Sequence, residues 1–283
     1  MKITFILLLL ILTSNSLFAQ KIYLKDKSTN ESIPYAHIAF SNNGKGTHSN
    51  EEGCFELKDN VDSLYITHIS FRDTVISTEN LPNVLYLNQS ENQLKSIDIR
   101  SSKKSKNNRD SFTPERDSKS HFNVTSFEIG TTFLKKEYKN WNFIKEVRIP
   151  ITLGKDFPIL RINIYKYDIE KKIPYLPIWS ALVREKDYKK NEIILEGLFL
   201  DIKNEDNLFV SLDLISHDVN ETNLSIDIPP YSNYKDALEV WIRKRKGSYC
   251  LIRNKRAKSD WIPFFVLSLQ HSEKEPIIHL EIE

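Results

Sequence analysis

Short β-rich runs separated by turn-forming residues limit the fold of this chain more than any other feature. The runs are rich in isoleucine, leucine, valine and aromatic residues, and clusters of Asn, Asp, Ser and Gly lie between them, where positive φ angles are tolerated. No run keeps a helical period. The composition also favours strands over helices, because the chain has 15 Phe and 12 Tyr but only 1 Met and 7 Gly. The sequence therefore predicts an all-β fold.

The first part of the chain has the length of one small sandwich. Strands are predicted at residues 22–24, 35–40, 54–57, 64–71, 84–87 and 97–99. About 80 residues with about seven short strands is typical of a Greek-key β-sandwich. Gly46 and Gly53 flank a polar turn at which special backbone angles are expected, and Phe55 follows to fill the core.

The second part of the chain, residues 122–283, is also predicted to consist of strands. They are predicted at residues 143–151, 159–167, 192–202, 208–216, 238–243, 248–252, 264–269 and 277–282. Residues 161–167 alternate polar and apolar side chains, as a half-buried strand does. A polar turn between paired runs is expected at residues 204–207, and a short turn between Val240 and Leu251 at Lys246-Gly247. Eight strands predict a sandwich of jelly-roll type.

Two segments are expected to lie outside the folded parts. Residues 1–19 have a positive start, an apolar run too short to span a bilayer and a small residue at Ala19, which predicts a cleaved secretory signal peptide. Residues 100–121 hold seven Lys or Arg, three Asp or Glu and one large apolar residue, and predict a solvated linker. The expected organisation is therefore a signal peptide at 1–19, domains at 20–99 and 122–283, and the linker at 100–121. The mature protein is expected in the periplasm, at the outer membrane or outside the cell.

Three motifs in the first part arrive in a characteristic order. They are Ser32-Ile33-Pro34-Tyr35-Ala36-His37-Ile38, then residues 46–55 (GTHSNEEGCF), then residues 64–71 (LYITHISF), with residues 94–99 (LKSIDI) closing the module. In this order they resemble the carboxypeptidase-regulatory-like domain, a transthyretin-like β-sandwich common in exported proteins of some Gram-negative bacteria. The resemblance covers less than a third of the chain. Parts of residues 159–261 resemble the jelly-roll-like regions that accompany this module in bacterial proteins of unknown function.

The resemblance implies an accessory module without peptidase activity. Metallocarboxypeptidases hold zinc with a His-x-x-Glu pair and a distant His, and the one His-x-x-Glu in this chain, His48-Ser49-Asn50-Glu51, lies within the motif that resembles the accessory module. The chain also lacks Gly-x-Ser-x-Gly and a phosphate-binding glycine loop. We therefore expect no catalytic residues, no enzyme activity and no cofactor.

The sequence gives only weak indications of a metal site or a disulfide. His37, His48 and His68 are interpreted as ordinary polar or interface positions, and the period-two set His279, Glu281 and Glu283 as an exposed strand face. Asp201, Asn204, Glu205 and Asp206 offer oxygen ligands for calcium without EF-hand spacing, and a hairpin turn is the favoured interpretation. The two cysteines, Cys54 and Cys250, fall in different predicted domains, so separate buried thiols are favoured over a disulfide.

Charge is balanced overall and uneven locally. The chain has 40 Lys and Arg against 38 Asp and Glu, which excludes a polycation built for nucleic acid. Residues 192–239 hold eleven acids and two lysines, whereas residues 243–258 hold eight bases and no acid. The eight bases form a candidate partner-binding patch for an envelope protein or an anionic glycan: Arg243, Lys244, Arg245, Lys246, Arg253, Lys255, Arg256 and Lys258. A solvated hairpin tip would explain the same residues.

Two function classes follow. The first is a non-catalytic structural or interaction module of the cell envelope that binds a protein partner, with open sheet edges pairing with partner strands. The second is a glycan-binding protein that uses the C-terminal sandwich, with stacking on aromatic side chains such as Trp141, Trp179, Trp241 or Trp261. A cluster of exposed aromatic residues on one sheet would favour the second class.

Overall fold

The fold is all-β, as predicted. The computed structural model describes residues 20–41, 46–57, 61–90, 118–122, 127–152, 159–189, 191–216, 238–244, 250–254, 260–263, 274–276 and 278–283. Within these ranges the only helical structure is two 3₁₀ turns, η1 (Lys135–Glu137) and η2 (Glu185–Asp187). Among the same residues, no helix is long and apolar enough to cross a membrane. The predicted signal peptide and residues 91–117 lie outside the described residues.

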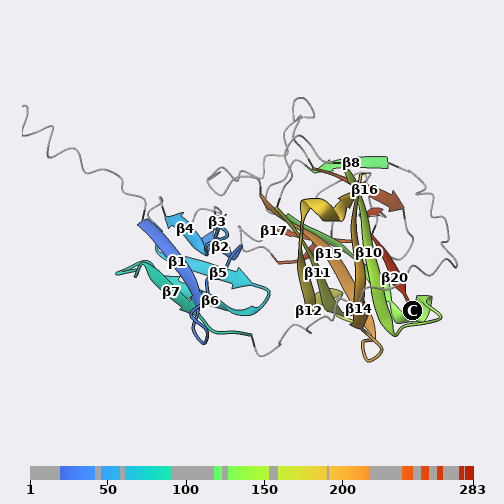
Figure 1. Cartoon of the computed structure of the whole chain (residues 1–283), viewed down its shortest axis with the longest axis horizontal. Helices are drawn as coiled ribbons and strands as arrows, with labels where there is room; N and C mark the ends of the chain where they lie inside the picture. Colours follow the sequence, from blue (N-terminus) through green and yellow to red (C-terminus); the bar gives the residue numbers. More distant parts are fainter. Residues whose placement is uncertain are drawn as a thin grey trace, which may run out of the picture.

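The first seven strands form two sheets, which we call the N-terminal sheet pair (Figure 1, blue to cyan). One sheet has the order β4-β1-β7, in which β1 pairs antiparallel with β4 and parallel with β7. The other has the order β3-β2-β5-β6. The strands are β1 (Gln20–Asp26), β2 (His37–Phe40), β3 (Gly46–His48), β4 (Cys54–Leu57), β5 (Ser63–His68), β6 (Phe71–Ser77) and β7 (Val84–Leu87).

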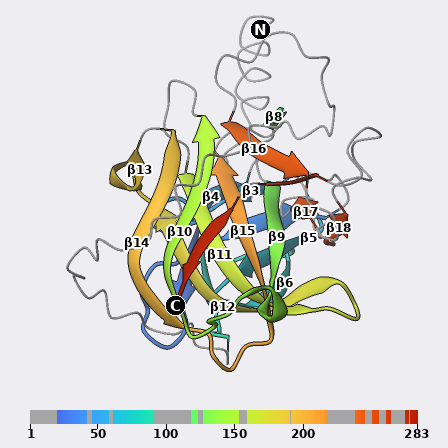
Figure 2. The ribbon, with the colours of Figure 1, turned by 90° about the vertical axis from the view of Figure 1, so that its right-hand side faces the viewer.

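The later strands form a second pair of sheets, the C-terminal sheet pair. One sheet has the order β13-β14-β10-β16-β19, with β20 also paired to β10 and β8 to β16, and the other has the order β12-β11-β15-β9-β17-β18. Figure 2 looks onto the first of these sheets, with the second behind it and the N-terminal strands farther back. The strands are β8 (Ser118–Phe122), β9 (Phe127–Leu134), β10 (Phe143–Thr152), β11 (Ile159–Asp168), β12 (Ile173–Val183), β13 (Tyr188–Lys189), β14 (Glu192–Asp201), β15 (Asn207–Ser216), β16 (Leu238–Lys244), β17 (Leu251–Asn254), β18 (Ile262–Pro263), β19 (Lys274–Pro276) and β20 (His279–Ile282).

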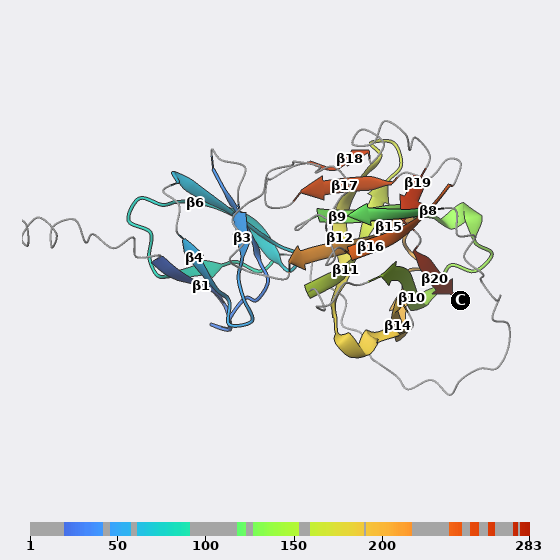
Figure 3. The same cartoon turned by 90° about the horizontal axis from the view of Figure 1, so that it is seen from above.

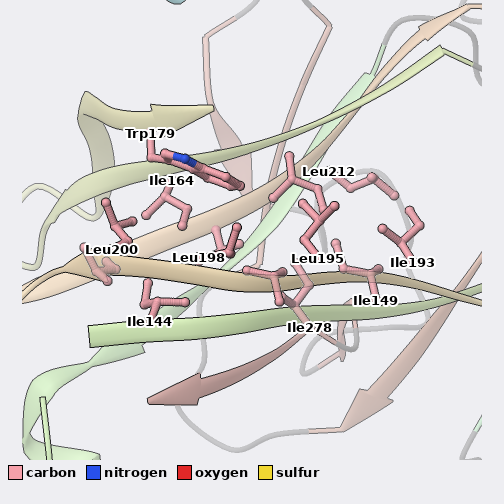
Figure 4. Close-up of a cluster of buried hydrophobic side chains, with 14 of the residues drawn as sticks. Ile144, Ile149, Ile164, Trp179, Ile193, Leu195, Leu198, Leu200, Leu212 and Ile278 are labelled. Atoms are coloured by element: carbon pink, nitrogen blue, oxygen red, sulfur yellow. The ribbon is translucent and has the colours of Figure 1, made fainter. Parts of the chain in front are cut away.

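Each sheet pair has its own hydrophobic core. The N-terminal core includes Ile22, Leu24, Ile38 and Phe55, whose side chains point inward from facing sheets. The C-terminal core is larger, and Figure 4 shows Ile144 and Ile149 of one sheet directed toward Ile164, Trp179 and Leu212 of the other. Burial of these inward-facing side chains is the main force holding each pair together. Cys54 and Cys250 are separate buried thiols, as the sequence favours.

Several strands differ from the prediction. Gly53 has φ +74°, as expected for its turn, but Gly46 instead begins the buried strand β3. Strand β12 was missed because Pro174 and Pro177 argue against a strand, yet it is an edge strand, where proline is tolerated. Strand β8 starts at Ser118, within the stretch predicted as linker. Lys246 and Gly247, where a turn is expected, lie outside the described residues, and the flanking strands β16 and β17 belong to different sheets.

A polar turn after β1 is fixed by the side chain of Asp26. Its Oδ1 accepts hydrogen bonds from the Ser28 hydroxyl at 2.6 Å and the Ser28 amide at 2.7 Å, and its Oδ2 accepts one from Gln89 Nε2 at 2.5 Å. The hydrogen bond from the Ser28 side chain, followed by that from Gln89, lowers the pKa of Asp26 to about 2. The ionised carboxylate therefore ties Gln89, which follows β7, to the end of β1.

We expect the contribution of Asp26 to stability to be lost in acid. Because its pKa is lower in the folded state than the ordinary value of 3.8, the stabilisation is complete above about pH 4 and disappears as the pH falls toward about 2. Denaturant unfolding of the wild type and of Asp26→Asn at pH 7, 4, 3 and 2 measures this. The variant should be less stable at pH 7, and the difference should shrink with the pH. A difference that stays constant down to pH 2 would contradict this account.

Candidate functional site

The outer face of the sheet containing β11, β15, β9 and β17 carries a row of four charged side chains. Cross-strand register places them side by side, one from each strand, in the order Arg161, Asp213, Glu128 and Arg253. The two acids are direct neighbours, which is unfavourable unless each has a positive partner. Arg161 on one side and Arg253 on the other supply those partners. Across the sheet, the row therefore consists of two neighbouring acidic side chains with one basic side chain on each side.

Glu128 is the centre of a hydrogen-bond network on this face. Its side chain is fully buried, and its Oε1 accepts hydrogen bonds from Ser211 Oγ at 2.6 Å, Tyr165 Oη at 2.7 Å and Asn163 Nδ2 at 2.8 Å. Its Oε2 accepts the guanidinium of Arg253, with Nε at 2.8 Å and Nη2 at 2.7 Å. Five donor contacts compensate the loss of water around this carboxylate.

Arg253 is held between Glu128 and two aromatic rings. Its guanidinium carbon lies 4.3 Å from the ring centroid of Trp261 and 5.7 Å from that of Tyr165, and Nη2 also donates to Tyr165 Oη at 3.0 Å. Burial alone would lower the pKa of Arg253, but the Glu128 carboxylate outweighs it and raises the pKa above the ordinary value. Burial, with Glu128 next, raises the pKa of Tyr165 well above its usual range, so the phenol remains a donor.

The other half of the row contacts the N-terminal sheet pair. His37 Nε2 of β2 lies 3.3 Å from Asp213 Oδ2, and both side chains are buried. Arg161 Nη2 donates to the backbone carbonyl of Tyr35 at 3.0 Å, and its Nη1 lies 4.0 Å from Asp213. The ring of His48, the cross-strand neighbour of His37, packs edge-on against it with centroids 4.5 Å apart. Figure 1 shows β2 and β3 on the side of the N-terminal sheets that faces the C-terminal strands.

An apolar contact lies beside the charged row. Ile69, in the turn between β5 and β6, packs against a cluster formed by Tyr165, Tyr167, Phe209 and Leu251, all buried, with Trp261 at its rim. Figure 3 shows the two sheet pairs meeting along this side. We call the whole contact, from the His37–Asp213 pair to Ile69, the junction. The arrangement fastens the two sheet pairs, because its charges are neutralised by one another and its aromatic faces are covered.

The structure separates the residues of the predicted basic patch. Arg253 lies inside the junction as the partner of Glu128, with a side chain only 25% exposed. Arg243 and Lys244 lie at the end of β16, in the other C-terminal sheet. Arg245, Lys246, Lys255, Arg256 and Lys258 lie outside the described residues. Partner binding by the other seven basic residues therefore stays a prediction. Arg253 instead pairs with Glu128 within the fold.

The residues considered as metal ligands have other contacts. Glu205 is buried, and its carboxylate pairs with Lys166 Nζ at 2.8 Å while its carbonyl accepts Trp141 Nε1 at 2.7 Å. Asp201 Oδ1 accepts the amide of Lys203 in the predicted turn. Across the described ranges, His, Cys, Asp and Glu side chains do not gather in groups of three that would hold a metal ion. His37 and His48 instead lie at an interface, one of the roles expected for them.

Sequence reasoning missed the charged row itself. Glu128 belongs to β9, which was not predicted, and the polar side chains of residues 161–167 were expected to face solvent. The sequence does contain one signal, since Arg161, Asn163 and Tyr165 share one face of a strand and include a charge and large polar groups. Nothing in the sequence says that another pair of sheets covers this face.

Comparison with known proteins identifies no relative. Neither a protein-family model, nor a curated protein, nor a solved structure matches the chain. The class of protein is therefore defined by the fold and the junction: an all-β protein in which one pair of sheets packs against the outer face of another.

Proposed function

We propose that this protein is an exported, non-catalytic interaction protein of the cell envelope that binds a protein partner by strand addition. The observation that carries the proposal is the open side of β6. This strand is the edge of the sheet β3-β2-β5-β6, and its Val75 is 62% exposed. An extended partner segment that pairs with such an edge gains backbone hydrogen bonds without a preformed pocket.

The hydrogen-bond pattern identifies the backbone groups that face outward. The amide of Thr78 donates to the carbonyl of Asp62, in register with the pairing of Ser77 and Ser63. Because hydrogen-bonded and non-hydrogen-bonded pairs alternate in an antiparallel ladder, Thr74 and Ile76 bond to β5 while Val75 and Ser77 point away. Near Arg72 the edge is covered, since its amide donates to the carbonyl of Asn88. Among the described residues, no strand pairs with the edge at Val75 and Ser77.

The positions of the aromatic side chains favour this function over glycan binding by the C-terminal sheets. The outer face that carries Tyr165, Tyr167 and Phe209 is covered by the junction, and Trp141 and Trp179 are core residues. The predicted signal peptide and the resemblance of residues 32–99 to an accessory module of exported proteins agree with a binding role in the envelope. The sequence also lacks the Gly-x-Ser-x-Gly motif and a phosphate-binding glycine loop.

Substitution of Val75 by proline is expected to abolish partner binding while leaving the fold intact. Proline removes an amide donor that faces the open edge, so a partner strand loses a hydrogen bond, whereas the ladder with β5 keeps all of its own. Tagged wild type, Val75→Pro and Val75→Ala are used to recover envelope proteins, which are quantified by mass spectrometry. Proteins bound by the wild type and by Val75→Ala should be lost with Val75→Pro.

A second proline variant controls for the strand itself. Ile76→Pro removes an amide that bonds to β5 and should lower the melting temperature, whereas Val75→Pro should change it little. Retention of every bound protein by a folded Val75→Pro variant would contradict strand addition at this edge.

A further inference from the structure

The outer face of the sheet β4-β1-β7 carries two exposed tyrosines. Tyr23 of β1 is 37% exposed and Tyr86 of β7 is 52% exposed. Register places Tyr23 opposite Val84 and Tyr86 opposite Lys25, so the two rings belong to one face at diagonal positions. Ile22, Leu24 and Leu85 point the opposite way, into the N-terminal core. The face therefore presents two aromatic rings and is separate from both the junction and the β6 edge.

A positive charge lies next to the rings without a carboxylate opposite it. Lys25 has Tyr86 as its neighbour on one side and Ser32 on the other. Lys21, on the same face, differs because it lies opposite Glu56. Among the described residues of this face, Lys25 therefore provides a positive charge with no carboxylate opposite it.

An amide group lies at the edge of the Tyr86 ring. The Tyr86 hydroxyl lies 3.5 Å from Asn30 Oδ1. Asn30 has φ 61°, which places it in the turn that follows β1. Flat aromatic rings with amide and hydroxyl groups at their edges can stack on sugar rings and hydrogen-bond to sugar hydroxyls.

We propose that this face of β4-β1-β7 binds an acidic polysaccharide, with sugar rings on Tyr23 and Tyr86 and an anionic group of the sugar at Lys25. The face is an open sheet, so it suits an extended chain that lies across it better than a small molecule that needs a pocket. The charge of Lys25 favours an acidic over a neutral glycan. The proposal goes beyond the strand-addition function and does not depend on it.

Affinity electrophoresis through gels that contain polygalacturonate, with dextran gels as the neutral comparison, tests this inference. The wild type should be retarded by polygalacturonate and not by dextran. Tyr23→Ala and Tyr86→Ala should each weaken binding about fivefold, since one aromatic contact is worth about 1 kcal/mol. Lys25→Gln should also weaken binding and reduce its dependence on salt. Tyr175→Ala is the matched control, because Tyr175 is 59% exposed but lies on β12.

Three results would overturn the proposal. The first is no retardation of the wild type by polygalacturonate, and the second is equal retardation by both gels. The third is retardation that survives Tyr23→Ala and Tyr86→Ala but disappears when Arg243, Lys244, Arg245 and Lys246 are replaced by Ser, which would assign the binding to the basic patch. Melting temperatures of the variants show whether each remains folded. Loss of strand addition in Val75→Pro with unchanged polysaccharide binding would separate this site from the proposed partner site.

Discussion

Replacement of Glu128 by alanine is expected to lower the free energy of unfolding by about 3–5 kcal/mol, the usual cost of removing one partner of a buried ion pair. The carboxylate is fully buried and accepts hydrogen bonds from Asn163, Tyr165 and Ser211 as well as from Arg253. Without it, these donors remain in a site with little access to water, and the Arg253 charge loses its partner. Denaturant unfolding at pH 7 measures the change.

Two further variants test whether the loss of stability in Glu128→Ala comes from the buried charge. Glu128→Gln keeps an acceptor for the neutral donors but removes the charge, so its loss should be smaller than that of the alanine variant. Glu146→Ala is the matched control, because Glu146 also lies on a strand and pairs with Arg148, but that pair is partly exposed. Its cost should stay below about 1 kcal/mol. If Glu128→Ala were no more destabilising than Glu146→Ala, the buried network would not be holding the sheet as described.

Replacement of Gly130 by alanine is the second change with a large expected effect. A β-carbon at this position would lie 2.6 and 2.7 Å from the Cε1 and Cζ atoms of Phe209 and would also overlap the backbone carbonyl of Val210. Gly130 lies in the row next to the charged one, opposite Ser211, and its missing side chain leaves room for the Phe209 ring. We expect a loss of about 3 kcal/mol, at the upper end of the usual cost of overpacking.

A double variant separates the two clashes at Gly130. Phe209→Leu removes the ring contact but not the overlap with the Val210 carbonyl, so Gly130→Ala combined with Phe209→Leu should recover only part of the loss. Thermal unfolding of the two single variants and the double variant gives this coupling directly. Full additivity of the single changes would contradict the predicted contact between the added methyl group and the ring.

The strands that the sequence predicts well are those with one simple pattern. β10, β11, β14 and β15 consist of long runs with apolar residues at alternate positions, and each was found within one residue of its predicted ends. β9 was missed because Glu128, Gly130 and two threonines interrupt its apolar pattern. Glu128, Gly130 and Thr132 share the outer face of β9, where a carboxylate network and a close ring contact replace ordinary packing. One of the strands that escape prediction therefore carries the centre of the candidate site.

The sequence by itself determined the all-β class and which side chains share a face of each long strand, because alternation along a strand is a local property. It also indicated that Gly53 adopts a positive φ and that Phe55 is a core residue, since both follow from a short turn motif. Only the tertiary structure decided which of those faces meet solvent. Arg161, Asn163 and Tyr165 form the polar face of an alternating strand, yet all three are buried, because the N-terminal sheets cover them. Arg253 likewise changes from a member of a basic run into the partner of Glu128, because strand pairing brings together residues that lie 125 positions apart.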